Sequence, residues 1–186
     1  MKKYIITISI LIAGLFNIEG QIDAGFTTVP VVNGKVVFDH FIITDQRQTT
    51  NQNYDVLQKW VKGKYSGSPL LSGIRFDDKA RSVTVSSKAE LLLPANSDGV
   101  REKMIMNYRF DATITNAGCM LVVRDITYQN AQKDGSSFFP KVYTAEQTIT
   151  NQAVNTAGEE SELRNNIRKG TLVFLNGLYS EITGAF

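Results

Sequence analysis

A strict alternation of apolar and polar side chains between Lys103 and Thr115 constrains the fold of this chain more than any other feature. Successive side chains of a β-strand point to opposite faces, so this pattern predicts one dry and one wet face. The dry face would carry Met104, Met106, Tyr108, Phe110, Ala112 and Ile114. Arg109, Asp111, Thr113 and Thr115 would lie on the wet face. Such a strand is typical of an antiparallel sheet that is covered on one side only.

Three further stretches predict strands. Ser82–Leu93 alternates in the same way, and Leu70–Phe76 and Cys119–Gln129 are the other two candidates. The loops at 77–81, 94–101 and 116–118 are short enough for neighbouring strands to pair as hairpins. The region from 70 to 129 therefore predicts an antiparallel sheet.

A separate hairpin is predicted near the N-terminus. Asn33-Gly34 stands between two runs of β-branched residues and suits the positive φ values of a type I′ turn. Pro30 cannot donate a ladder hydrogen bond, so the first arm should be short and lie at an edge. The second arm is expected to continue to Ile43.

Helical periodicity appears in three places. Tyr54, Leu57, Val61 and Tyr65 form an apolar stripe on a predicted helix over 51–64, with a cap at Thr49, Thr50 or Asn51. A short helix is predicted at 145–154. A C-terminal helix is predicted over about 157–182, opened by a capping box of Thr156 and Glu159. Gly170 and Asn176-Gly177 weaken it, and a break is expected near 176.

These elements predict an α+β fold of the order β-α-β-β-β-β-α, a curved antiparallel sheet with its helices packed on one face. The 186 residues, 42% of them hydrophobic, suffice for one core, and a single cysteine excludes an internal disulfide. Residues 21–186 are therefore expected to form a single domain.

The first twenty residues have the organisation of a secretory signal peptide. Lys2 and Lys3 precede an uncharged apolar run from Ile5 to Phe16, which is too short to cross a bilayer comfortably. Cys119 is the only cysteine, so the cleavage region holds no site for a lipid anchor. We expect a secreted or periplasmic protein with no stable membrane anchor after cleavage of residues 1–20.

The charge balance argues against a nucleic-acid partner. The whole chain has a formal net charge of +2, and loss of Lys2, Lys3 and Glu19 with the leader lowers it to +1. Nucleic-acid binding depends on several contacts from Lys or Arg to phosphates, and this chain lacks the excess of positive charge that such contacts require. The expected partner is an unidentified envelope or extracellular protein or ligand.

The chain resembles a family of secreted bacterial domains of unknown function that have a TBP-like fold, the fold of the repeat in TATA-binding protein. The resemblance rests on VPVVNGKVVF, on Lys59-Trp60-Val61 in the predicted helix, and on the strand segment from Arg124 to Tyr128. It covers roughly residues 29–182. Family members often carry a Gly-Arg-Tyr-Arg-like stretch where this chain has Gly118-Cys119-Met120-Leu121. The resemblance implies a fold and an exported location, but no activity.

Motifs for catalysis, cofactors or metals are absent from the sequence. The single histidine, His40, lies inside a predicted strand, and Cys119 opens an apolar run, so both are expected to be structural. No zinc, calcium, phosphate-loop or nucleophile motif occurs, and we expect no cofactor and no metal. Asp111 and Asp125, on adjacent predicted strands, are the one pair of acids that could act together.

Two hypotheses of function follow. The first is a non-catalytic binding or interaction domain, and the second is a hydrolase or lyase that uses carboxylates without His or Cys. The candidate binding residues are two phenylalanines in a loop, two acids and two arginines: Phe138, Phe139, Asp111, Asp125, Arg109 and Arg124. A pocket with convergent acids would favour an enzyme, whereas an exposed patch with an aromatic centre would favour a partner protein.

Overall fold

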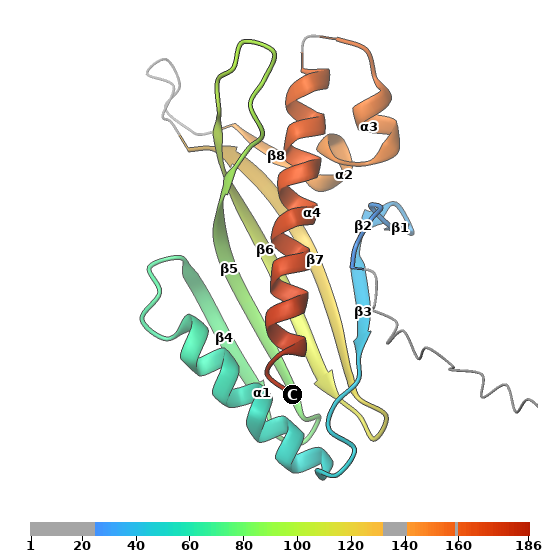
Figure 1. Ribbon diagram of the computed structural model, residues 1–186, viewed down its shortest axis with the longest axis vertical. Coiled ribbons are helices and arrows are strands. Elements are labelled where there is room, and N and C mark those ends of the chain that lie inside the picture. Colours follow the sequence, from blue (N-terminus) through green and yellow to red (C-terminus); the bar gives the residue numbers. More distant parts are fainter. Residues whose placement is uncertain (1–24, 132–140, 159) are drawn as a thin grey trace, which may run out of the picture.

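A six-stranded antiparallel sheet forms the centre of the molecule (Figure 1). The computed structural model describes residues 25–131, 141–158 and 160–186. Along the sheet the order is β3 (Phe38–Ile42), β7 (Cys119–Asn130), β6 (Lys103–Ile114), β5 (Ser82–Leu92) and β4 (Leu71–Asp77). A short strand, β8 (Val142–Thr144), also pairs with β7. The four predicted strands of the central region are thus confirmed.

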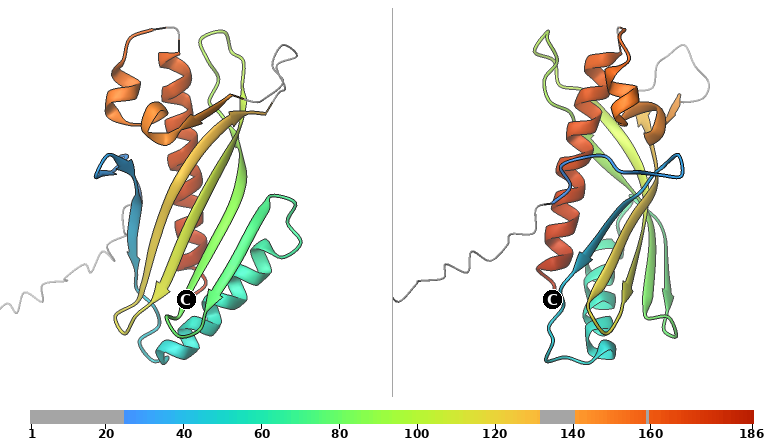
Figure 2. Two further views of the ribbon diagram at one scale, coloured as in Figure 1. Left: turned by 180° about the vertical axis from the view of Figure 1, so that it is seen from behind. Right: turned by 90° about the vertical axis from the view of Figure 1, so that its right-hand side faces the viewer.

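Two long helices cover one face of this sheet, as the alternation predicts (Figure 2). Helix α1 (Thr50–Tyr65) begins at Thr49, whose side chain forms a capping box with Gln52. Helix α4 (Ser161–Thr183) runs across the same face. The predicted α+β architecture, with its helices on one side, is confirmed. We call the other side the open face of the sheet.

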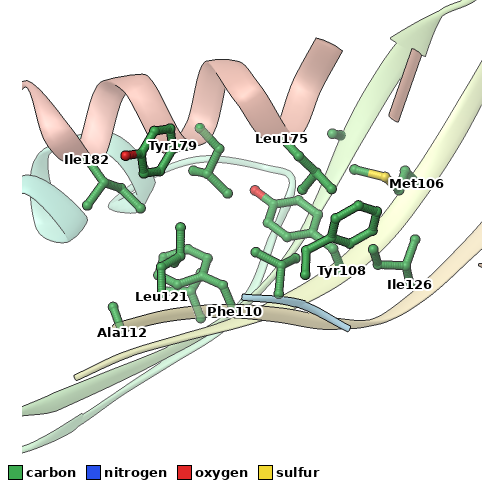
Figure 3. Packing of buried hydrophobic residues seen from close by; sticks show 14 of the residues in the cluster. Met106, Tyr108, Phe110, Ala112, Leu121, Ile126, Leu175, Tyr179 and Ile182 are labelled. Atoms are coloured by element: carbon green, nitrogen blue, oxygen red, sulfur yellow. The ribbon is translucent and has the colours of Figure 1, made fainter. Parts of the chain in front are cut away.

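The core lies between this sheet and helices α1 and α4, and it contains every residue predicted for the dry face of 103–115 (Figure 3). Leu175 and Ile182 of α4 extend toward the sheet, where Phe110 is completely buried. Two buried hydroxyl pairs lie within the apolar layer. The Tyr65 and Tyr108 hydroxyls are 3.1 Å apart, and the Tyr128 hydroxyl lies 2.9 Å from Oγ1 of Thr171. Each pair satisfies polar atoms that would otherwise be costly to bury.

The N-terminal hairpin forms as predicted, but its second arm is shorter than expected. Strands β1 (Val31–Val32) and β2 (Lys35–Val36) pair around Asn33 and Gly34, whose φ values of 51° and 75° fit the predicted turn. After β2 the chain leaves this hairpin and enters the main sheet as β3. The Val37 amide makes the last contact between the arms, donating to the Pro30 carbonyl, and the Val36 amide donates to Glu146.

The C-terminal third differs from its prediction in detail. The predicted short helix is two helices, α2 (Ala145–Thr148) and α3 (Asn151–Asn155), because Thr150 caps the second one. The predicted capping box at Thr156 is wrong, since α4 begins at Ser161 and the Thr156 hydroxyl donates to the Gln152 carbonyl.

The expected break near residue 176 is also wrong, and α4 is continuous. Asn176 does not form a turn, and its side chain instead binds the backbone of Phe26. Its Oδ1 accepts from the Phe26 amide at 2.6 Å, and its Nδ2 donates to the Phe26 carbonyl. Gly170 faces the end of β5, where a Cβ would approach Leu91 to 3.8 Å and the side chain of Leu93, just after the strand, to 3.3 Å. The two positions that appear to weaken the helix therefore serve packing against distant segments.

Candidate functional site

The open face of the sheet carries a row of aligned polar side chains. The strand registers place Arg75, Thr84, Asp111, Val122 and Asp39 side by side from β4 to β3. The next row holds Ser86, Arg109 and Arg124 on β5, β6 and β7. Because strand side chains alternate, none of these points into the core. The rows bring both predicted arginines and one predicted acid onto one surface.

Asp111 is the centre of this cluster. Its Oδ1 accepts from the Thr84 hydroxyl at 2.6 Å and from Nη2 of Arg109 at 3.3 Å. Its Oδ2 accepts from Nε and Nη2 of Arg124 at 3.0 and 2.8 Å. The Asp111 side chain is 23% exposed, so these bonds are partly shielded from water. We call Thr84, Arg109, Asp111 and Arg124 the arginine cluster.

The cluster keeps Asp111 ionised. Partial burial of the carboxyl acts to raise its pKa, but the hydrogen bonds from Thr84 and Arg124 and the charges of both arginines outweigh that effect. The net result is a pKa below the ordinary range for aspartate. A carboxyl group with a lowered pKa is a poor general acid at neutral pH.

The two arginines share this carboxylate unequally. Arg124 uses two nitrogens on Asp111, and the charge of Asp125 further raises the pKa of its guanidinium. Arg109 makes a single long hydrogen bond, and its Nε is buried with no acceptor among the described residues. Arg109 therefore has hydrogen-bonding capacity, including its buried Nε, that no described residue uses.

An apolar patch adjoins the arginine cluster on the same face. Phe41 of β3 and Met120 of β7 are register partners, and each is 38% exposed. Gly118 supports this arrangement, since its φ is 153° and a Cβ there would lie 2.7 Å from the Phe41 ring. Val122, half-buried, connects the patch to Asp111 through the shared register row. We call Phe41, Met120 and Val122 the apolar patch.

Asp125 lies apart from Asp111, in a β-bulge. Two residues of β7, Asp125 and Ile126, stand opposite one residue of β6, Tyr108, in the strand pairing, and Asp125 has a φ of 55°. The outer edge of β7 changes partner here, because β3 pairs with residues 119–123 and β8 with 127–129. A cavity of about 350 Å³ opens at this gap, lined by Lys35, Asp125 and Glu146 among others. The exposed Asp125 thus belongs to the sheet edge.

The remaining sequence candidates do not form a reactive group. The His40 ring packs edge-on against Tyr179, with ring centroids 4.2 Å apart, and Cys119 is buried. Phe138 and Phe139 lie outside the described residues, as does the predicted leader 1–20. Across 25–131, 141–158 and 160–186, no three His, Cys, Asp or Glu side chains gather in a way that could hold a metal.

Sequence reasoning missed Phe41, Met120 and Thr84 as members of the site. Alternation in the segment VVFDHFII already places Phe41 opposite His40, which was the available signal for its exposure. Met120 carried no such signal, because Cys119–Val123 is almost uniformly apolar. None of the described helices has the length and apolar character of a membrane span.

Comparison with solved structures finds the same fold in two bacterial proteins. A TBP-like protein from Parabacteroides distasonis superposes with a TM-score of 0.70 and 23% identity, over 84% of this chain and 96% of that one. A DUF4468 family protein from Bacteroides ovatus gives a TM-score of 0.64 and 18% identity, over 84% and 89%. No protein-family model and no curated protein matches the sequence. The expected TBP-like fold is confirmed, and neither neighbour has an assigned function.

Proposed function

We propose that this chain is an exported, non-catalytic binding domain that recognises a protein partner through the open face of its sheet. The observation that carries the proposal is the apolar patch lying beside the arginine cluster on one surface. Phe, Met and Arg are enriched at the centres of protein interfaces, where an apolar anchor is combined with charged hydrogen-bond donors. The region between Phe41 and Arg109 offers this combination.

The alternative, a hydrolase or lyase that uses carboxylates, finds less support. Such an enzyme needs one protonated acid near neutral pH, and the pKa of Asp111 is lowered. Asp125 is exposed in a bulge, where no hydrogen bond joins it to Asp111 among the described residues. The proposed role for Asp111 is therefore to hold Arg124 and Arg109 in place.

Export is the other half of the proposal, and the charged, apolar and polar segments of residues 1–20 support it. Protein recovered from producing cells should lack these residues when its intact mass is measured. Recovery of most of the protein with Met1 in place would contradict export.

Affinity capture from an envelope extract tests the binding role. Phe41→Asp should reduce the retained partner at least about tenfold, since it places a charge within an apolar interface. Val173→Asp is the matched control, because Val173 is 73% exposed on α4 at the opposite side of the molecule. Thermal unfolding verifies that both variants are folded. Equal retention by wild type and Phe41→Asp would refute the open face as the binding surface.

A further inference from the structure

The two arginines of the cluster share the nearby carboxylates unequally, and Arg109 has fewer of them than Arg124. Arg124 lies beside two carboxylates, those of Asp111 and Asp125. Arg109 shares Asp111 with Arg124 and Thr84, and it donates the longest of the four hydrogen bonds, at 3.3 Å. A guanidinium has five N–H donors, so most of those on Arg109 have no acceptor among the residues that the structure describes.

The Nε atom of Arg109 shows this shortage of hydrogen-bond acceptors most clearly. It is buried, and no acceptor among the described residues satisfies it, although a buried donor without a partner is costly. The guanidinium as a whole is not enclosed, because the Arg109 side chain is 39% exposed. The exposed part of this guanidinium can therefore meet an acceptor that arrives from solvent.

The surroundings of Arg109 favour an anionic acceptor. Its register partner on β5 is Ser86, and Lys88 follows two residues later on the same face. Arg75 lies exposed on that face at the edge strand β4. Between β4 and β7 these two register rows hold three arginines, Arg75, Arg109 and Arg124, but one carboxylate, that of Asp111, which is already shared. Glu90 is the next acid along β5, beyond Lys88.

We infer that Arg109 is a receptor for a carboxylate of the bound protein, and that Arg124 and Asp111 are its positioning residues. This inference rests on the proposed function and names the chemistry of the partner, an acidic segment with an Asp, a Glu or a chain end. A carboxylate carries one negative charge and two coplanar oxygens, which match the planar donors of a guanidinium. It would complete the hydrogen bonding of Arg109 and balance the positive charge left over in the arginine cluster.

A peptide titration followed by NMR tests this inference directly. The probes are a hexaglutamate peptide, a hexaglutamine peptide and inorganic phosphate, each added to the full chain. The signal is the Nε–Hε cross-peak of Arg109, assigned by its loss in Arg109→Lys. Hexaglutamate should shift this cross-peak to saturation, whereas hexaglutamine should leave it unchanged.

Two variants separate a specific contact from general charge attraction. Arg109→Gln should weaken hexaglutamate binding at least about fivefold, and Arg75→Gln, which removes the same charge from the same face, by less than about twofold. Binding is measured for these variants from the backbone amide signals of β5. Thermal unfolding confirms that Arg109→Gln is folded, and Arg109→Lys provides a second variant that keeps the charge.

Three results would overturn the inference: no shift with hexaglutamate, equal weakening by both variants, or a phosphate response at the same or lower concentration. The last would assign a general oxyanion site in place of a carboxylate receptor. Failure of the proposed function gives a different pattern. Hexaglutamate would then bind at Arg109, while capture of the envelope partner would be unaffected by Phe41→Asp.

Discussion

Arg124 of β7 reaches diagonally to Asp111 on the neighbouring strand β6, and both its Nε and its Nη2 donate to the same carboxylate oxygen, at 3.0 and 2.8 Å. The register partner of Asp111 is Val122, so the contact spans two residues along β7. It lies immediately before the bulge at Asp125. The pair therefore fixes the relative position of β6 and β7 at the point where the ladder becomes irregular.

Removal of the carboxylate charge should destabilise the protein. Asp111→Asn removes the carboxylate charge that the two arginines share, and we expect a loss of about 1–3 kcal/mol in the free energy of unfolding. Urea denaturation measures this loss. Asp39→Asn is the control, since Asp39 is exposed in the same register row and should change stability by less than about 0.5 kcal/mol. An equally small loss of stability in Asp111→Asn and Asp39→Asn would show that the arginine cluster does not stabilise the folded protein.

The same pair predicts a pH dependence of stability. The pKa of Asp111 is lowered in the folded protein, so its contribution is present above the unfolded value of about 3.9. That contribution is lost as pH falls below about 3.9 and through the folded pKa. The stability difference between wild type and Asp111→Asn should therefore shrink as the pH is lowered from about 5. A difference that stays constant down to acid unfolding would contradict the assigned pKa direction.

Phe110 tests the architecture of the core. It is fully buried between the sheet and the helices, with its ring near those of Trp60 and Tyr65. Phe110→Ala should cost about 3–5 kcal/mol in the free energy of unfolding, because it removes apolar contacts and leaves a cavity. Lys88→Ala, at an exposed position of β5, serves as the reference in the same denaturation series. A loss below about 1 kcal/mol would place Phe110 on the wet face.

Cys119 should be chemically inert in the folded protein. Burial raises the pKa of its thiol to about 12, against a smaller opposing effect from a backbone hydrogen bond at Thr113. At pH 8 the thiol is therefore protonated, and the protonated form is a weak nucleophile. A thiol reagent should label Cys119 only after the protein is unfolded in urea, as followed by mass spectrometry. Fast labelling of the native protein would contradict the burial of this residue.

The sequence predicted the strands and the dry face well, because alternation over twelve residues admits few other structures. It failed where a contact joins segments far apart in the chain. Asn176 is hydrogen-bonded to Phe26, 150 positions away in the sequence, and Glu146 to Val36, 110 positions away. Neither contact leaves a pattern in the neighbouring residues from which it could be predicted. Strand β8 has three residues and no periodic pattern to detect.

Three residues of the candidate site were named from the sequence, but Phe41, Met120, Thr84 and the geometry that joins them were not. Arg109, Asp111 and Arg124 stood out as charged residues within strands, yet their association depends on the exact pairing of β6 with β7. The bulge at Asp125 shifts the pairing beyond Arg124, and a non-glycine residue at φ 55° gives no warning of it in the sequence. The exposure of Met120 likewise follows from register and not from residue type.

Site-directed photocrosslinking in producing cells tests the central claim, that the open face is the recognition surface. The photoreactive residue benzoylphenylalanine replaces Thr113, which lies on that face between Ser82 and Met120, or Val173 on the outer side of α4. If the open face is the recognition surface, a discrete crosslinked partner is expected from position 113 and none from position 173. A partner captured from position 173 and absent from position 113 would contradict it.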